Sequence, residues 1–295
     1  MNSIKISAPA KVNLFLKVLN RRKDGYHNII TLFERISLAD EIEISKIPHG
    51  IRFKSDKPIT ADPKDNLAYK AAESILKYAK AGKGVQVKLK KNIPIAAGLG
   101  GGSSDAASTL MGINKLYNLK LGQGVLIKLA KKLGADVPFF ILDKPFAIAR
   151  GIGDRLKVVN SDLVLWHLIV CTGSKISTAR IYGMFDASSK CLTGCASDDK
   201  ISRSLRQKLD FNTVESMLYN DLKEAAVASA PVTGTILERL AYTTGRRAMM
   251  SGSGPSVFCL NRSRKEALKA KRKLLTGLPA GNKNGWQVFI TKTYN

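Results

Sequence analysis

A glycine-rich run at residues 98–105 has the composition of a loop that binds phosphate. Four glycines fall within five residues of this run, so the loop carries few Cβ atoms and its amides can converge on an anion. Ser103, Ser104 and Asp105 follow as residues that favour a helix start, and apolar residues then recur at helical spacing. A glycine loop that leads into a helix presents free N–H groups and the positive end of the helix dipole to phosphate. The run predicts a nucleotide-phosphate site, while a flexible turn before a helix would also fit it.

Other known nucleotide-binding motifs fit the chain less well. No Gly-x-x-x-x-Gly-Lys-Ser/Thr sequence of a P-loop occurs in it. A dinucleotide-binding motif needs an acidic residue about twenty positions further on, where Gln123 stands. The His-Arg-Asp and Asp-Phe-Gly sequences of protein kinases are also absent.

The length and composition indicate an ordinary globular protein. A chain of 295 residues is long for one core, so two domains are expected. Its residues are 44% hydrophobic and 24% charged, and no apolar stretch approaches membrane-spanning length. Residues 1–7 lack the apolar core of a signal peptide. We therefore expect a cytoplasmic protein with no membrane partner.

The charge is strongly positive. Lysine and arginine number 48 against 23 aspartates and glutamates, a net charge of +25. Nucleic-acid binding is one interpretation of such an excess. The basic residues are spread through both halves of the chain, and the densest cluster, at residues 262–273, falls on a predicted helix whose charges face solvent. A generally basic surface that attracts anionic substrates is the favoured interpretation, with no nucleic-acid partner.

The four cysteines predict reduced thiols. Cys191 and Cys195 form a C-x-x-x-C pair, but the chain has only three histidines and none is close to that pair. A zinc site is therefore not favoured, and no metal ligand can be assigned.

The pattern of apolar residues predicts an α+β fold. In the first half it indicates strands at 4–6 and 12–18 with a break at Pro9, strands at 29–36, 41–44 and 85–89, a helix from Asn66 to before Gly82, a helix after the glycine run, and a helix at 122–133. In the second half it indicates strands at 163–171, 257–260 and 286–294, helices near 214–222 and 235–243, and a helix that begins after the capping residue Ser263. The polar stretch 188–203 is expected to be a mobile loop.

Three separated segments resemble one superfamily, the GHMP kinases. They are Ala8-Pro9-Ala10-Lys11-Val12-Asn13-Leu14, the run from Pro94 to Ala107, and Met250-Ser251-Gly252-Ser253-Gly254-Pro255-Ser256. This resemblance implies a two-domain α+β fold. Residues 1–155 would form a nucleotide-binding domain like domain 2 of ribosomal protein S5, and residues 156–295 a ferredoxin-like substrate domain.

Further segments resemble one branch of these kinases, whose acceptor is a cytidylylated methylerythritol. They are Arg21-Arg22-Lys23-Asp24-Gly25-Tyr26-His27, Gly134-Ala135-Asp136-Val137-Pro138-Phe139-Phe140 and Ala149-Arg150-Gly151-Ile152-Gly153. The branch transfers the γ-phosphate of ATP to the 2-hydroxyl of the methylerythritol moiety, in the non-mevalonate route to isoprenoid precursors. A related GHMP kinase acting on mevalonate, homoserine or a sugar is the alternative.

The resemblance also implies the catalytic and ATP-binding residues. Asp136 would accept or orient the proton of the attacking hydroxyl, and Lys11 would orient Asp136 and the transferring phosphoryl group. From the residues alone, Gly134 ends one helix and Pro138 prevents an immediate restart, which exposes Asp136 at a turn. The residues implied for ATP are Asn66, Pro94, Ala96, Gly98, Leu99, Gly100, Gly101, Gly102, Ser103 and Ser104. Asn66 could equally be a helix cap, as could Asp105, and Mg²⁺ is expected with ATP although its ligands are unassigned.

The acceptor-binding residues follow from the same resemblance. Tyr26 and His27 would recognise the cytosine ring, and Tyr182 would supply a second stacking ring. Asn13 would lie near the acceptor hydroxyl, and Gly252 and Ser253 would complete the substrate pocket. The chain departs from the family at residues 177–179, where Ser-Thr-Ala replaces a Pro-Thr-Pro run, which weakens the assignment of Tyr182. We expect a monomer or a weak homodimer.

Overall fold

The computed structural model describes residues 1–80, 82–174, 176–188, 209–276 and 285–295, which divide into two compact units. Unit 1 comprises Met1–Lys11, Leu38–Ile95 and Gly100–Lys144, and unit 2 comprises Val12–Ser37, Ala96–Leu99 and Pro145–Asn295. Two long strands, β1 (Ser3–Arg21) and β2 (His27–Ile47), contribute residues to both units. The expected division into 1–155 and 156–295 is continuous in sequence, whereas these units interleave, and that division stays a prediction.

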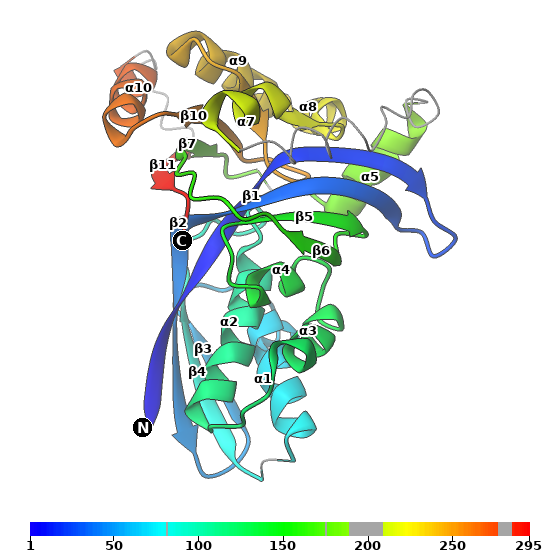
Figure 1. The fold of residues 1–295 in the computed structure, drawn as a ribbon, viewed down its shortest axis with the longest axis vertical. Coiled ribbons are helices and arrows are strands. Elements are labelled where there is room, and N and C mark those ends of the chain that lie inside the picture. The colour runs from blue at the N-terminus through cyan, green and yellow to red at the C-terminus, as the bar shows by residue number, and fades with distance from the viewer. Residues whose placement is uncertain (81, 175, 189–208, 277–284) are drawn as a thin grey trace. The chain divides into compact units, whose positions relative to one another are not determined.

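Unit 1 is a mixed sheet with helices packed on one face (Figure 1). Its strand order is β3 (Ile51–Ser55), β4 (Gly84–Lys90), β2, β1, with β4 antiparallel to β2 and parallel to β3. Its other elements are the 3₁₀ turn η1 (Pro63–Asp65), α1 (Leu67–Tyr78), α2 (Gly101–Leu116), α3 (Gln123–Lys131) and α4 (Val137–Ile141). Alternation explains the burial, because Ile42 and Ile44 of β2 are buried while Glu41 is exposed.

Gly112 allows helix α2 to approach this sheet closely. A Cβ atom at Gly112 would lie 2.6 Å from both Ile44 Cδ1 and Ile6 Cδ1, on β2 and β1. Real Cβ atoms do not come so near, so the packing of α2 against the sheet requires glycine at this position.

Unit 2 contains the other parts of β1 and β2 and a separate four-stranded sheet. The antiparallel hairpin β5 (Phe146–Gly151) and β6 (Arg155–Val158) pairs with β2, and β8 (Tyr219–Asn220) pairs in parallel with β1. The four-stranded sheet has the order β11 (Gln287–Lys292), β7 (Trp166–Cys171), β10 (Val257–Asn261), β9 (Ala248–Met250), all antiparallel. Its helices are α5 (Thr178–Ala187), α7 (Phe211–Met217), α8 (Lys223–Ser229), α9 (Val232–Thr244) and α10 (Arg264–Thr276).

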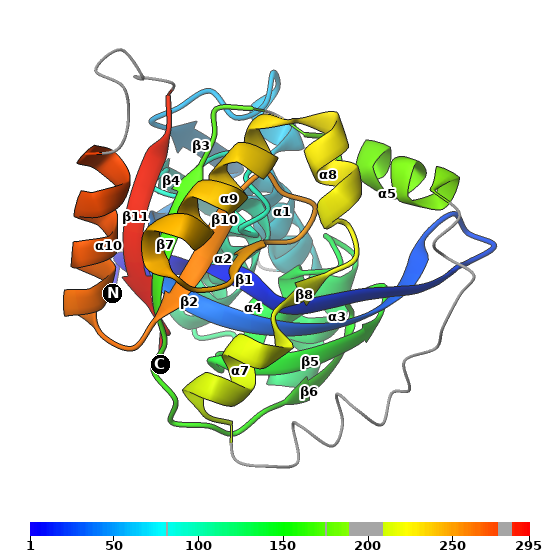
Figure 2. The same cartoon turned by 90° about the horizontal axis from the view of Figure 1, so that it is seen from above.

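Helices α9 and α10 bury apolar side chains against one face of that sheet (Figure 2). Ile236 and Leu240 of α9 and Leu274 of α10 pack with Leu168 of β7 and Val257 of β10, and all five are fully buried. The basic residues of α10 lie on its opposite, exposed side, as the sequence predicts.

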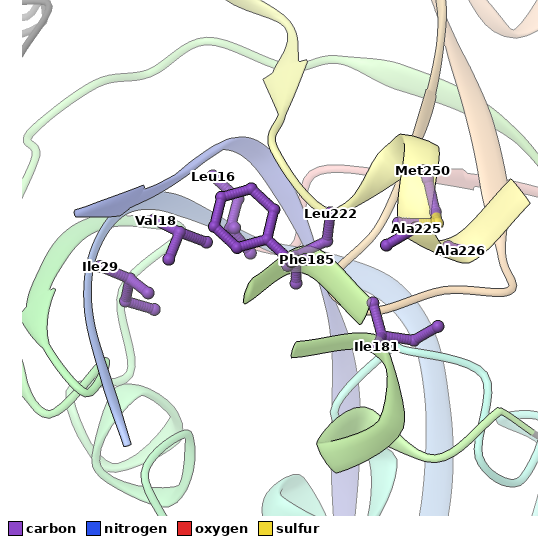
Figure 3. Close-up of a cluster of buried hydrophobic side chains, with 9 residues drawn as sticks. All are labelled: Leu16, Val18, Ile29, Ile181, Phe185, Leu222, Ala225, Ala226 and Met250. Carbon is purple, nitrogen blue, oxygen red and sulfur yellow. The ribbon is translucent and has the colours of Figure 1, made fainter. Parts of the chain in front are cut away.

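A second apolar cluster in unit 2 fixes helix α5 (Figure 3). Ile181 and Phe185 of α5 pack with Leu16 and Val18 of β1 and Ile29 of β2. The cluster also takes in Leu222, Ala225, Ala226 and Met250. The burial of Ile181 and Phe185 fixes the rotation of α5 about its axis, so its polar residues lie on the remaining sides of the helix.

The structure differs from three of the expected elements. Pro9 does not break β1, because β8 pairs with β1 only at Phe15 and Leu16 and Pro9 therefore lacks a partner on that edge. The helix expected at 214–222 is interrupted, since Leu218 leaves the helical conformation and Tyr219–Asn220 form β8. A helix, α4, does restart after Gly134, because proline is well accommodated in the first turn of a helix.

Two further predictions concern parts of the chain that the structure does not describe. The loop expected at 188–203 lies outside the described residues apart from Ser188, which ends α5. Cys191 and Cys195 lie there too. Cys171 and Cys259 are both buried free thiols, as expected, and burial raises the pKa of each to about 11.

Candidate functional site

The glycine run forms the start of helix α2. Gly100 is the N-cap and takes a left-handed conformation with φ of 69°, which glycine adopts without strain. The first helical hydrogen bond runs from Ser104 N to Gly100 O at 2.9 Å, so the N–H groups of Gly101, Gly102 and Ser103 have no acceptor within the helix. The glycines are thus the first turn of the helix itself, and α2 begins two residues before the predicted helix-start residues.

These groups fit a phosphate ligand. Gly102 is exposed, and a Cβ placed there would find no heavy atom nearer than 3.7 Å, so its amide is open to approach. The hydroxyl oxygen of Ser104 is buried, and the described residues offer it no hydrogen-bond partner. Free amides at a helix N-terminus beside an unsatisfied hydroxyl are a chemically suitable set of donors for phosphate oxygens.

Lys11 lies against this turn and reaches Asp136. A Cβ atom at Gly100 would come within 2.9 Å of Lys11 Cγ and 3.2 Å of Phe140 Cζ, so the lysine stem runs along Gly100. Its Nζ atom is 3.4 Å from Asp136 Oδ2. The Lys11 side chain is 5% exposed, whereas the Asp136 side chain is 32% exposed. The structure therefore brings the two predicted catalytic residues and Gly100 together within unit 1.

Asp136 has the position that a reactive carboxylate needs. It is the N-cap residue of α4, but its side chain makes no capping hydrogen bond. The following residues Val137, Pro138 and Phe139 are buried and hold the start of α4 in place. The backbone of Asp136 is consequently held in place, while its carboxylate is partly exposed to solvent.

A buried ionic cluster lies behind the glycine turn, and the sequence did not predict it. Lys91 Nζ forms ion pairs with Asp40 and, at 2.8 Å, with Asp105, and all three side chains are at most 4% exposed. A Cβ at Gly101 would lie 3.1 Å from Lys91 Nζ. Asp40 Oδ1 also accepts the amides of Asn92 and Ile93 at 2.6 and 2.8 Å.

Asp105 is therefore neither a helix cap nor an exposed ligand. Burial raises its pKa to about 7, which outweighs the opposing effect of the Lys91 charge. The predicted cap failed because the helix begins earlier, which moves Asp105 into the second turn and onto the buried face of α2.

Asn66 caps α1, as the sequence predicts. Its side-chain oxygen accepts a hydrogen bond from Ala68 N at 2.9 Å, and the residue is 5% exposed. Leu67, the next residue, is 3.7 Å from the position of a Cβ at Gly102. This places the start of α1 beside the start of α2 within unit 1, while a role of Asn66 toward nucleotide stays a prediction.

The preceding part of the phosphate run contacts the third motif within unit 2. Gly98 has φ of +75°, and a Cβ there would collide with the carbonyl oxygens of Ser251 and Gly254. Ser251 Oγ donates to Gly98 O at 3.0 Å, and Ser256 N donates to Ala97 O at 3.3 Å. The two glycine turns thus hold each other in place.

Other residues of the predicted ATP set have distinct surroundings. Leu99 is 1% exposed as a whole residue, so almost none of its surface is open to a ligand. Ala96 has φ of 55°, an unusual conformation for a residue with a Cβ, and is exposed, while Pro94 is half-buried.

Asn13 and Ser253 are fixed by hydrogen bonds in unit 2. Asn13 Nδ2 donates to Thr31 Oγ1 at 2.8 Å, and Asn13 N donates to Ser251 Oγ at 3.3 Å. Ser253 Oγ is 2.9 Å from Thr178 Oγ1 in the first turn of α5. The carbonyl of the neighbouring Gly252 accepts a hydrogen bond from Asn220 Nδ2 at 2.8 Å.

The three predicted base-binding residues are positioned by β2 and α5. His27 begins β2, and its ring stacks on that of Tyr182 with centroids 4.8 Å apart and planes at 24°. His27 Nε2 lies 2.7 Å from Asp186 Oδ1, an acid that the sequence analysis did not single out. Tyr26 is 61% exposed, so its ring is open to a flat ligand.

The described residues form no ready-made set of metal ligands. Among the described residues, no group of three or more histidine, cysteine, aspartate or glutamate side chains is arranged to hold a metal ion. Nor does any helix in the described part of the chain have the length and apolar character needed to cross a membrane.

Known proteins match this chain over almost its full length. Residues 66–144 match the GHMP kinases N terminal domain and residues 203–280 match the GHMP kinases C terminal domain. A protein of Pelobacter propionicus called 4-diphosphocytidyl-2-C-methyl-D-erythritol kinase is 40% identical over 299 residues, covering 99% of this chain and all of the relative. One of the same name in Geobacter metallireducens is 41% identical over 293 residues, covering 99% of each chain.

Solved structures agree with this result. The crystal structure of a 4-(cytidine 5'-diphospho)-2C-methyl-D-erythritol kinase superposes with a TM-score of 0.79 at 33% identity, covering 99% of this chain and all of that one. A homoserine kinase from Cytophaga hutchinsonii superposes at 0.72 with 20% identity, covering 100% of this chain and 95% of that one, which shows the shared fold. The predicted α+β fold of the superfamily is confirmed, and the chain belongs to the GHMP kinases, in the family of the 4-diphosphocytidyl-2-C-methyl-D-erythritol kinases.

Proposed function

We propose that this protein transfers the γ-phosphoryl group of ATP to the 2-hydroxyl of 4-(cytidine 5'-diphospho)-2-C-methyl-D-erythritol. The names of the full-length relatives support this substrate. The observation that carries the chemistry is the pair of Lys11 Nζ and Asp136 Oδ2, 3.4 Å apart beside the bare amides that begin α2.

Asp136 acts as the proton acceptor in this proposal. The acceptor hydroxyl oxygen forms a bond to the γ-phosphorus, the bond between that phosphorus and the bridging oxygen breaks, and the hydroxyl proton passes to Asp136. Lys11 holds Asp136 in place and offers positive charge to the transferring group. Phosphoryl transfer depends mainly on such positioning and charge stabilisation.

The amides of Gly100, Gly101, Gly102 and Ser103 would hold the phosphates of ATP, with the Ser104 hydroxyl as a further donor. Asn66, Pro94, Ala96, Gly98 and Leu99 complete the set proposed for the nucleotide. Bound Mg²⁺ would supply charge neutralisation on the phosphates, which themselves provide most of its ligands in such sites.

Tyr26, His27 and Tyr182 would hold the cytosine ring of the acceptor, by stacking and hydrogen bonding. Asn13, Gly252 and Ser253 would bind the remainder of that molecule. Related GHMP kinases use acceptors without a pyrimidine, so the exposed ring of Tyr26 favours the cytidylylated substrate over mevalonate or homoserine.

A turnover assay with a panel of acceptors tests the proposal. The purified protein should release ADP with ATP, Mg²⁺ and the cytidylylated methylerythritol, and should show background rates with mevalonate, homoserine and galactose. Omission of Mg²⁺ should abolish the activity. Turnover of mevalonate with no reaction on the cytidylylated compound would overturn the assignment.

We further propose that the enzyme works in the cytoplasm on small molecules alone, as a monomer or weak homodimer. Light scattering across a concentration series should give the mass of one chain, 32.1 kDa, rising toward twice that mass only at high concentration. A stable higher oligomer would contradict this.

A further inference from the structure

Asp186, which contacts the predicted base-binding residue His27, lies outside the set of residues predicted from the sequence. His27 Nε2 is 2.7 Å from Asp186 Oδ1, and the His27 side chain is 5% exposed. Arg21 Nη1 is 3.7 Å from the other carboxylate oxygen of Asp186. A carboxylate beside a guanidinium group is an acceptor, so the hydrogen of this bond belongs to Nε2 of the imidazole.

Helix α5 brings the partners of the His27 ring together. Tyr182 and Asp186 are four residues apart and therefore share one face of α5. Tyr182 stacks on the imidazole plane, and Asp186 holds one ring nitrogen in that plane. The neighbouring residues Ile181 and Phe185 anchor the helix in the apolar cluster with Ile29, two residues after His27 (Figure 3).

These contacts leave the other nitrogen, Nδ1, with a definite character. In a neutral imidazole that carries its proton on Nε2, Nδ1 has a lone pair and is a hydrogen-bond acceptor. No residue in the described parts of the chain is a hydrogen-bond partner of His27 Nδ1. In the neutral ring it is therefore available to a ligand as an acceptor.

We infer that Asp186 is a specificity-determining positioning residue: it keeps the His27 proton on Nε2, so that Nδ1 accepts a hydrogen bond from the 4-amino group of a cytosine ring. This inference rests on the proposed function for the identity of the base. The 4-amino group is the hydrogen-bond donor on the pairing edge of cytosine, and uracil has a carbonyl oxygen in its place. A lone pair on Nδ1 would bind the first and repel the second.

Asp186→Asn tests the inference because it reverses the polarity of the contact without changing the shape. The amide NH₂ group can donate to Nε2, which favours the tautomer with the proton on Nδ1, as in other enzymes where an asparagine replaces a histidine-orienting aspartate. KM for the cytidylylated acceptor should rise roughly 10- to 100-fold, the cost of an unmade hydrogen bond in a buried site. KM for ATP and kcat should change little.

The decisive measurement is the preference for cytosine over uracil. The ratio of kcat/KM for the cytidylylated acceptor to that for its uridylylated analogue should fall at least about tenfold in Asp186→Asn. Asp186→Glu should restore much of the ratio, and Asp162→Asn, an exposed acid elsewhere in unit 2, should leave it unchanged. An unchanged ratio in Asp186→Asn would overturn the inference.

A second measurement reads the proton directly and does not depend on activity. With three histidines in the chain, long-range ¹⁵N–¹H correlation spectra are simple, and His27→Gln identifies the His27 signals. The wild type should show His27 protonated on Nε2 and unprotonated on Nδ1, and Asp186→Asn should shift the proton toward Nδ1. A wild-type His27 with a proton on Nδ1, whether alone or in addition to one on Nε2, would refute the inference even if the enzyme were active.

The two tests separate this inference from the proposed function. A wild type that does not phosphorylate the cytidylylated acceptor would refute the proposed function. It would also refute the role of His27 in recognising cytosine, whatever the spectra show. An active wild type whose base preference does not depend on Asp186 would refute the inference alone.

Discussion

Asp136 is the side chain on which the chemistry can be tested most directly. Asp136→Asn keeps the volume of the side chain but removes its basicity, so kcat should fall roughly 100- to 10,000-fold. The far-UV circular dichroism spectrum should match that of the wild type, because the carboxylate is a third exposed and makes no capping hydrogen bond. A stopped-time assay of ADP release measures the effect.

Asp65→Asn is the matched control for this variant, since Asp65 is an exposed acid of unit 1 whose ion pair with Lys70 is at the surface. It should have wild-type kcat. If Asp136→Asn retained a third of the wild-type kcat or more, Asp136 could not be the proton acceptor.

Tyr26 tests the binding of the acceptor at the same scale. Tyr26→Ala should raise KM for the cytidylylated acceptor roughly 5- to 100-fold, because stacking on a base contributes about 1–3 kcal/mol. KM for ATP should not change, and stability should be unaffected because the ring is 61% exposed. Steady-state kinetics with each substrate varied in turn gives both constants.

Tyr26→Phe retains the ring and should behave like the wild type. Tyr78→Ala removes another exposed ring, on α1, and should leave both KM values unchanged. Equal increases in the two KM values of Tyr26→Ala would show that the ring does not act on the acceptor alone.

Helix α2 carries a prediction on the pH dependence of stability. Burial raises the pKa of Asp105 from its ordinary value of 3.8 to about 7 in the folded protein. Between these values the folded state holds a proton that the unfolded state has lost, so the contribution of Asp105 is greatest below pH 4 and is lost as the pH rises to about 7. The loss is at most about 4 kcal/mol, at about 1.4 kcal/mol for each pKa unit.

Asp105→Asn should remove this loss. Urea unfolding at pH 4.5 and pH 7.5 should give a smaller decrease in the free energy of unfolding for the variant than for the wild type, while Asp65→Asn should match the wild type. Equal decreases in Asp105→Asn and the wild type would show that Asp105 is ionised throughout this range in the folded state.

The elements that the sequence predicts well are those whose signal is local. Asn66 precedes a run of apolar residues at helical spacing, and its side chain accepts a hydrogen bond from an amide in the first turn of α1. This cap needs no partner from a distant part of the chain. The apolar strands β7 and β10 and the helices α9 and α10 likewise follow from their periodicity. Lys11 and Asp136 were placed together by resemblance to a family and were confirmed as neighbours by the distance between them.

The elements that the sequence does not reveal depend on contacts far along the chain. Nothing in the sequence distinguishes Lys91 from the other lysines, because its ion-pair partners Asp40 and Asp105 are distant in the chain. Asp186 likewise cannot be recognised from local sequence, because its hydrogen-bond partner His27 lies 159 positions earlier in the chain. Pro9 remains within β1 because β8 pairs with β1 only at Phe15 and Leu16. The helix predicted at 214–222 is interrupted at Leu218 because the next two residues pair with β1.

The charge of the whole molecule leads to a prediction on rates. Both proposed substrates are anionic, and a net charge of +25 should speed their arrival at low ionic strength. Raising the salt from about 0.01 to 1 M shortens the Debye length from about 30 to about 3 Å. We expect kcat/KM to fall about tenfold or more over this range while kcat stays nearly constant.

Comparing sodium chloride with sodium acetate in these kinetic measurements distinguishes screening of charge from binding of a specific ion.

The same salt series also tests the interpretation that the positive charge binds nucleic acid. Fluorescence anisotropy with a labelled duplex should give only weak binding that vanishes at moderate salt, and tight sequence-dependent binding would contradict a purely electrostatic surface effect.

Gly100 constrains how such an enzyme can evolve. It begins α2 in a backbone conformation that other residues adopt only with strain, and it leaves room for the stem of Lys11. Any heavier residue would disturb the start of α2 and the stem of Lys11 together. If Tyr26, His27 and α5 bind the acceptor as proposed, a change of acceptor would arise there, and the chemistry near Gly100 would tolerate substitution far less readily than the choice of acceptor.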